Sequence, residues 1–510
     1  MFSWRLAARP GLPVATAVLT VGAVTLCAAP GWAQTAADRA ADNAWQPAAI
    51  AHAQKMRGFA DRDRGTQPTP AVIPQHEVDF DASGLIATDQ AEGATVTATN
   101  PFFQNLGTNG RTCFTCHQPQ TGWGVSAASV QARFYLSFGS DPIFRLVDGA
   151  TCPTDDVSSF GAKLQSYNLL LGKGLIRIGL PIPANSEFQV AAVSDPYGCN
   201  TNPATGLTGP ASGIVSVYRR PLPATNLAFD SAIMWDGREP DLSSQAADAT
   251  LGHAQGNAPP SLAQQQQIVD FESGLSTAQF FDKSAKYLSA DRATGGPAAL
   301  ATQYFYIGIN DPFGLNPTGA AFNPAIFDLY EAWTSLPGDG PVVAKREQIA
   351  RGEALFDRTP INITGVAGIN DVLGQANFAG FCGTCHSTPN VGDHSVKAPL
   401  DIGIADAHAK APPVLDISGL PVFTLQCVAG PLNGQTFTVT DPGRALISGK
   451  CADIGKIKGP ILRGLAARAP YFHNGSAASL MDVVNFYDQR FKIGFTERQK
   501  ADLVAFLETL

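Results

Sequence analysis

Two short motifs organise the chain, RTCFTCHQ at residues 111–118 and GFCGTCHS at residues 380–387. Each contains Cys-x-x-Cys-His, the signature of covalent c-type haem attachment. Two thiols one turn apart can form thioethers with both haem vinyl groups, and the adjoining histidine then reaches the iron. A redox Cys-x-x-Cys or a zinc site would leave both histidines unexplained. The sequence therefore predicts two haem c groups, with the attachment and iron-binding residues Cys113, Cys116, His117, Cys382, Cys385 and His386.

The chain starts with a segment typical of a secretory signal. Arg5 and Arg9 form a charged start, Val14 to Ala29 is mostly apolar, and small residues precede Gln34. The apolar run is short and interrupted, and no later stretch approaches the roughly 20 apolar residues that a membrane span requires. We therefore expect a signal peptide over residues 1–33, a mature protein in the periplasm, and no membrane span.

Charge and cysteine use limit the possible partners and the redox compartment. Removing the two arginines of the signal leaves 33 of the 35 basic side chains against 43 acidic ones. This acidity argues against nucleic acid and favours a basic redox protein, such as a small cytochrome or a cupredoxin. In an oxidising compartment we expect two disulfides between nearest neighbours, although spacing does not exclude the other two connectivities. The expected pairs are Cys152–Cys199 and Cys427–Cys451.

The expected fold is mainly α, with two cytochrome c-like helical haem domains and a β-containing insertion in the N-terminal half. The insertion is expected because three strand-like pieces, starting at Ile176, Phe188 and Ile214, are separated by Gly and Pro. A Pro/Gly cluster at residues 337–341 marks the domain boundary. The expected units are an arm at 34–80, an N-terminal haem domain at 81–336 with its insertion at about 125–218, and a C-terminal haem domain at 342–510 with an insertion at about 395–455.

Three helices are predicted in the C-terminal domain. Residues 344–356 have an amphipathic pattern, and apolar residues from Leu480 to Tyr487 share one helix face after Ser479. Thr496 followed by Gln499 is a capping box, and apolar residues then recur at helical spacing up to Leu510. We expect the final helix to pack on the first helix of this domain.

Two further stretches carry a family resemblance. Trp235-Asp-Gly-Arg238 lies between the two motifs, and the residues from Arg463 to His473 read RGLAARAPYFH before Asn-Gly and a helix. With the two haem motifs, they resemble the bacterial di-haem cytochrome c peroxidases and their MauG-type relatives. The resemblance covers about half of the mature chain, at residues 101–123, 219–255, 345–390 and 459–510.

The resemblance implies a division of labour between the haems. The N-terminal haem would react with peroxide, the C-terminal haem would store or relay an oxidising equivalent, and Trp235 would assist electron transfer between them. Arg463 would meet a haem propionate, with a plain surface arginine as the alternative. The family also holds a calcium ion through an asparagine in an Arg-Asn-x-Pro-like stretch. Here the text is RRPLP at residues 219–223, which puts that ion in doubt.

The resemblance also points to a sixth ligand for the second haem. In the family, peroxidases carry a methionine fourteen residues after the histidine that corresponds to His473, and MauG-type proteins carry a tyrosine. Tyr487 occupies that position here. An anionic oxygen ligand stabilises oxidised iron, whereas thioether ligation raises the potential. The alternative is a structural tyrosine, with His394 or His408 as the ligand instead.

The stretch after Trp235 lacks the glutamate that the family carries. Gln245 matches a family glutamine, Ala249 replaces a proline, and Gln255 replaces the glutamate that shuttles the peroxide proton. An amide cannot take and return a proton near neutral pH, so assistance of about 10²–10⁴ in rate is lost at that position. His253 stands two residues earlier. It could replace the acid, ligate the iron and close the site, or be an ordinary surface or packed histidine.

Three functions remain open on the sequence. The first is a periplasmic di-haem oxidoreductase that uses hydrogen peroxide, with His253 in place of the acid. The second activates dioxygen, as in the di-haem rubber oxygenases, and an apolar substrate channel would favour it. The third is a non-catalytic di-haem electron carrier or sensor with both irons six-coordinate. An open coordination position on the N-terminal iron separates the first two functions from the third.

Overall fold

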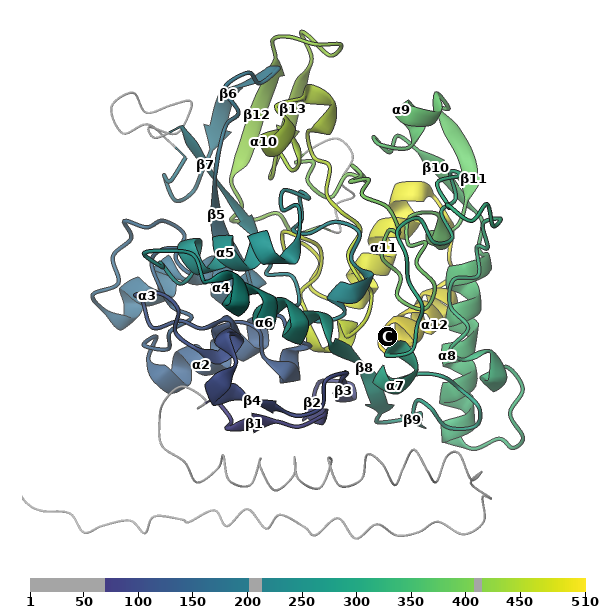
Figure 1. The fold of residues 1–510 in the computed structure, drawn as a ribbon. Helices are drawn as coiled ribbons and strands as arrows, with labels where there is room; N and C mark the ends of the chain where they lie inside the picture. Colours follow the sequence, from purple (N-terminus) through teal and green to yellow (C-terminus); the bar gives the residue numbers. More distant parts are fainter. Residues whose placement is uncertain (1–68, 201–212, 408–414) are drawn as a thin grey trace, which may run out of the picture.

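The computed structural model describes residues 69–200, 213–407 and 415–510 (Figure 1). The expected signal at 1–33, most of the arm and His408 lie outside the described residues. Within the described ranges the α-helices are α2 (Ala127–Ser137), α3 (Phe160–Ser166), α4 (Asn168–Lys173), α5 (Leu242–Gly252), α6 (Leu262–Ser273), α7 (Pro297–Leu300), α8 (Pro341–Arg358), α9 (Asn370–Leu373), α10 (Ala445–Ser448), α11 (Leu480–Phe491) and α12 (Glu497–Leu507).

Strands are about as numerous as helices in these ranges. They are β1 (Val72–Ile73), β2 (His76–Phe80), β3 (Gly84–Gln90), β4 (Thr95–Val96), β5 (Ile176–Pro181), β6 (Phe188–Ser194), β7 (Ile214–Arg219), β8 (Leu275–Asp282), β9 (Lys286–Tyr287), β10 (Ile361–Thr364), β11 (Asn377–Gly380), β12 (Val422–Cys427) and β13 (Thr436–Val439). The three strands expected in the insertion are present as β5, β6 and β7. The description "mainly α" is not confirmed, because strands occur in both halves of the chain.

The three predicted C-terminal helices are confirmed as α8, α11 and α12, which lie together on the right of Figure 1. Thr496 and Gln499 form the predicted capping box on α12, and Ser479 caps α11. Helices α8 and α12 cross closely at Gly352, where an added Cβ would lie 2.0 Å from the carbonyl oxygen of Asp502. The final helix therefore packs on the first, as expected.

The core around α8 and α12 also includes residues that precede the Pro/Gly cluster. Leu288 and Trp333 are fully buried against the same apolar cluster as Ile349 and Phe506. Helix α8 begins at Pro341, the last residue of the Pro/Gly cluster. The packing therefore extends the C-terminal core upstream of residue 337.

The two insertions build one sheet together. Strand β6 of the first insertion pairs antiparallel with β12 of the second, and β13 completes the order β13–β12–β6 (Figure 1). The sheet shares one core with β5 and β7. The cysteine pairing agrees with the prediction, with Sγ–Sγ distances of 2.13 Å for Cys152–Cys199 and 2.05 Å for Cys427–Cys451.

The first haem motif lies beside a second sheet, ordered β2–β3–β8–β9. Trp123 follows this motif, is fully buried, and donates from Nε1 to Thr88 on β3 over 2.9 Å. Helix α6 packs on the same aromatic cluster through Ile268 and Phe271. Within the described part of the chain, no helix has the length and apolarity needed to cross a membrane.

Candidate active site

Each Cys-x-x-Cys-His motif folds into one tight turn. Cys113–Thr115 and Cys382–Thr384 are 3₁₀ turns, and the amide of each following histidine donates to the carbonyl of the first cysteine over 3.0 Å. Thr115 and Thr384 accept from the backbone amides three residues earlier. All four cysteines of the two motifs are free thiols, so they remain available for thioether formation.

The two motif histidines are oriented in the same way. Nδ1 of His117 lies 2.8 Å from the carbonyl oxygen of Trp123, and Nδ1 of His386 lies 2.6 Å from that of Gly392. A carbonyl only accepts, so Nδ1 carries the hydrogen and Nε2 keeps its lone pair for a metal. Burial lowers the pKa of His117 and lowers that of His386 to about 4, which keeps both rings neutral. This arrangement fits proximal haem ligands.

Each motif opens onto its own cavity. The first cavity is lined by Cys113, Cys116 and His117. The second is lined by Cys382, Cys385 and His386. Both walls are mostly apolar, as a porphyrin ring requires, so the residues present fit one haem c in each cavity.

Trp235 lies between the two cavities and lines both. It is buried, its Nε1 donates to the carbonyl of Arg220 over 2.7 Å, and its ring centroid is 6.1 Å from that of His473. The next residue, Asp236, is fully buried and pairs with Arg219 at 2.5 Å. Arg219 also pairs with Asp441 from the second insertion. This buried pairing fixes the loop that carries Trp235.

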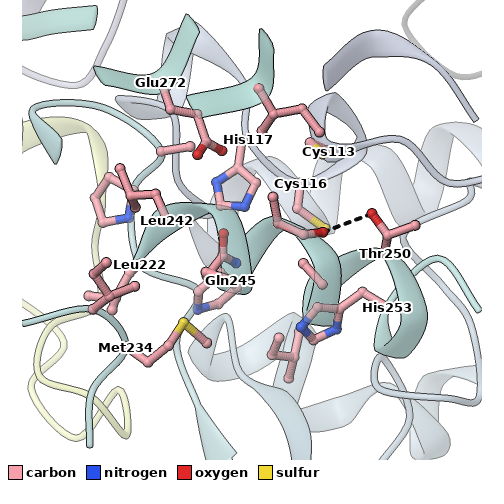
Figure 2. Close-up of a pocket in the computed structure, with 18 of the residues that line it drawn as sticks. Cys113, Cys116, His117, Leu222, Met234, Leu242, Gln245, Thr250, His253 and Glu272 are labelled. Atoms are coloured by element: carbon pink, nitrogen blue, oxygen red, sulfur yellow. Dashed lines mark hydrogen bonds between the residues drawn. The ribbon is translucent and has the colours of Figure 1, made fainter. Parts of the chain in front are cut away.

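Helix α5 supplies the wall of the first cavity opposite the motif. Gln245 and His253 both line the cavity, and Figure 2 shows them on the other side of its space from His117. Gln255 is exposed and is not among the lining residues. The helix ends at Gly252, and Gln255 adopts a left-handed conformation with φ 54°, so its side chain turns away to accept from Asn109.

Comparison with known proteins agrees with this geometry. A family model described as RoxA-like, cytochrome c-like matches residues 458–493. The methylamine utilization protein MauG of Methylorubrum extorquens is 27% identical over 316 residues, which is 58% of this chain and 66% of MauG. These similarities support an assignment to the di-haem cytochrome c peroxidase/MauG family.

Two cytochrome-c peroxidases of Denitromonas iodatirespirans match shorter parts of the chain. IdrP2 is 34% identical over 144 residues, which is 26% of this chain and 36% of IdrP2. IdrP1 is 42% identical over 69 residues, which is 11% of this chain and 18% of IdrP1. The chain thus covers less than two thirds of the length of each of these three relatives. A crystal structure of a MauG-like protein associated with microbial copper homeostasis is 17% identical, with a TM-score of 0.29 over 60% of this chain and 78% of that one.

In the second cavity, Tyr487 is the only one of the sixth-ligand candidates among the described residues that lines the wall. It packs against the same apolar cluster as Cys382 and Cys385, and burial raises its pKa. His394 is buried but lines neither cavity. His473 lines the second cavity, and neither of its ring nitrogens has a hydrogen-bond partner.

Arg463 is buried, but it does not line either haem cavity. Its Nη2 donates to the carbonyl of Gly296 over 3.4 Å, while Nε and Nη1 have no partner. At the position of the family's calcium-binding stretch, Arg220 is also buried and donates to the carbonyls of Val125 and Arg468. No group of three or more metal-binding side chains occurs in residues 69–200, 213–407 and 415–510.

Three acids that the sequence analysis missed line the first cavity, Asp148, Asp230 and Glu272, and two of them lie beside its histidines. Asp148, from the first insertion, accepts from His253. Glu272, on α6, lies beside His117 (Figure 2), and burial raises its pKa to about 8. Glu272 lies on the same buried face of α6 as Ile268 and Phe271. An acid on the apolar face of a helix is the sequence signal that could have identified it. Asp148 has no such signal, because its contact with His253 spans 105 residues.

Proposed function

We propose that this protein is a periplasmic di-haem c-type oxidoreductase that reduces hydrogen peroxide at its N-terminal haem. The observation that carries the proposal is Trp235, which lines both haem cavities and so gives electrons a short route between them. The secretory pattern of residues 1–33 supports the periplasm. The names of the relatives IdrP1 and IdrP2 support peroxide as the substrate.

The haems, when bound, supply a peroxide-reactive iron in the first cavity and an electron-storing iron in the second. Cys113, Cys116 and His117 would hold the first haem. Cys382, Cys385 and His386 would hold the second, with Tyr487 as its sixth ligand. Oxygen ligation by Tyr487 would favour the oxidised iron.

His253 would manage the protons of peroxide, and Gln245 would orient the substrate. Nε2 of His253 would accept a proton from one peroxide oxygen and return it to the departing one, which is the general acid–base role. The amide of Gln245 can donate a hydrogen bond to peroxide but cannot exchange a proton. Hydrogen peroxide, two protons and two electrons give two water molecules. The electrons would come from a redox protein, such as a small cytochrome or a cupredoxin.

Dioxygen activation is the second candidate, and the apolar wall of the first cavity favours it. Ile176, Leu222 and Met234 line this cavity together with the haem-attachment residues. Such a wall would suit an apolar substrate next to the iron. The family model described as RoxA-like also supports this candidate.

Rapid mixing separates these functions. The diferric and half-reduced proteins are mixed with hydrogen peroxide, and the Soret band is followed. The proposal predicts a fast absorbance change that depends on peroxide concentration, followed by oxidation of an added reduced cytochrome. A silent Soret band in both redox states would overturn it. Oxygen uptake with an apolar substrate and no response to peroxide would establish the second candidate instead.

A further inference from the structure

A carboxylate lies directly behind the histidine in the first cavity. Nδ1 of His253 is 2.6 Å from Oδ2 of Asp148, and the other carboxylate oxygen accepts from Nη1 of Arg111 over 2.5 Å. The side chains of Asp148 and Arg111 are 5% and 4% exposed, whereas that of His253 is 36% exposed. The three groups form a chain that leads from the protein interior to the cavity.

Arg111 is itself fixed by the backbone around it. Its Nη2 donates to the carbonyl of Ile143 over 2.6 Å, and its Nε donates to that of Pro142 over 2.8 Å. Arg111 precedes Cys113 by two residues, so the group that holds Asp148 belongs to the haem-attachment loop. The carboxylate of Asp148 is therefore fixed in position relative to the haem-attachment residues.

Residues 107–109, just before the first haem motif, also hold the backbone next to His253 in place. Asn109 donates to the carbonyl of His253 over 2.8 Å, and the amide of Thr108 donates to that of Ala254 over 3.0 Å. At Gly107 an added Cβ would lie 1.9 Å from the carbonyl oxygen of Ala254, so only glycine permits this approach. Both the backbone and the ring of His253 are thus fixed relative to the first motif.

Asp148 is an acceptor only. Burial acts to raise its pKa, but Arg111 and His253 outweigh burial and hold the pKa below its usual range. An ionised carboxylate cannot donate, so Nδ1 of His253 carries the hydrogen and Nε2 is left as the basic atom. The ring then presents its lone pair away from Asp148.

We propose that Asp148, anchored by Arg111, is the positioning residue that makes His253 the proton-transfer group of the first haem cavity. This inference rests on the proposed function, which gives His253 that role. The carboxylate lost at Gln255 is thereby replaced by one that acts through an imidazole. The proton moves only between peroxide and Nε2, and Asp148 stays ionised and stabilises the imidazolium that forms.

The test is Asp148→Asn in the haem-loaded protein. An amide has one acceptor oxygen, so Arg111 and His253 compete for it, and an amide NH₂ facing Nδ1 favours the tautomer with hydrogen on Nε2. We expect the peroxide reaction to slow by about 10²-fold, within the usual range for acid–base assistance. Association of hydrogen cyanide with the ferric haem also delivers a proton to a nearby base, so its rate should fall in parallel.

The pH profile gives a readout that a purely structural role would not move. Without its anionic partner the imidazolium is less stable, so the pH midpoint of the peroxide reaction should move to lower pH in Asp148→Asn. Other titratable groups lie near His253 or line the same cavity and are unchanged in this variant. They are Arg111, His117, Arg219, Arg220, Asp230, Arg238 and Glu272, while Cys113 and Cys116 are thioethers in the haem-loaded protein and do not titrate.

Asp141→Asn is the matched control. Asp141 is a buried aspartate seven residues before Asp148 and pairs with Arg133, but it lines neither cavity. It should leave the peroxide and cyanide rates unchanged. Combining Asp148→Asn with His253→Ala should slow the reactions no further than His253→Ala alone. Additive losses, or wild-type rates in Asp148→Asn when His253→Ala is slow, would overturn the positioning role. Wild-type rates in His253→Ala would instead refute the proposed function of His253.

Discussion

The indole of Trp235 donates to the backbone carbonyl of Arg220 over 2.7 Å, and in this orientation its ring lies against both haem cavities. Arg220 is fixed in turn by donation to the carbonyls of Val125 and Arg468, one from each half of the chain. The hydrogen bond therefore ties the aromatic ring to the junction of the two haem sites.

Trp235→Phe should slow electron exchange between the haems while leaving both haems attached. The phenyl ring fills part of the space but loses the hydrogen bond, at a cost of about 1 kcal/mol in the free energy of unfolding. Stopped-flow reduction followed at the two Soret components measures the exchange. Trp333→Phe is a control of the same chemistry, because Trp333 is buried but lines neither cavity. Unchanged exchange in Trp235→Phe would show that electrons take another route.

Tyr487→Phe should raise the reduction potential of the C-terminal haem. The substitution removes the oxygen that would ligate and stabilise the oxidised iron, while the ring still packs on Phe491. A spectroelectrochemical titration with magnetic circular dichroism reads the potential and the ligand together. If neither quantity changes, Tyr487 is a packing residue and the ligand lies elsewhere.

Glu272 should make stability depend on pH. Burial raises its folded pKa to about 8 from the ordinary value of 4.5. The folded state therefore binds the proton more tightly, and the free energy of unfolding falls by about 1.4 kcal/mol for each pH unit between about 4.5 and 8. Glu272→Gln should raise the melting temperature at pH 9 relative to the wild type and change it little at pH 4. Equal pH dependence in both proteins would contradict a buried, protonated Glu272.

The parts that the sequence predicted are those fixed by local chemistry. The two haem turns depend on residues within one turn, and α12 begins directly after Thr496 because this capping residue needs only Gln499 as its partner. The remaining features depend on contacts between distant segments. Strand β6 finds β12 more than two hundred residues away, so the shared sheet and the extra strand content were not foreseen.

The positions of Gln245 and Gln255 show in the same way that features set by distant contacts could not be predicted from the sequence. The family resemblance, through its spacing from Trp235, singled out Gln245, and this residue lines the wall. The same spacing carried to Gln255 assumes a continuous helix, but α5 ends at Gly252 and the chain turns before Gln255. Asn109 and Thr108, which lie far away in sequence, bind the backbone carbonyls directly after the end of this helix.

Gly352→Ala should strongly destabilise the C-terminal haem domain. The new methyl would lie 2.0 Å from the carbonyl oxygen of Asp502, and backbone cannot move away as a side chain can. We expect a loss of about 3 kcal/mol in the free energy of unfolding, measured by chemical denaturation, at the upper end for overpacking. Gly161→Ala in α3 is the control, because its Cβ would meet nothing within 4 Å. That variant should gain up to about 1 kcal/mol from helix propensity, and equal effects would refute the close helix crossing.

The central claim is that His253 transfers the peroxide proton in a cavity that lacks the usual acid. The most direct measurement is the second-order rate constant for hydrogen peroxide, by rapid mixing, in the wild type, His253→Ala and the control His76→Ala, whose histidine lines neither cavity. The account predicts a loss of about 10²-fold or more in His253→Ala alone. Equal rate constants in all three proteins, with both haems attached, would contradict it.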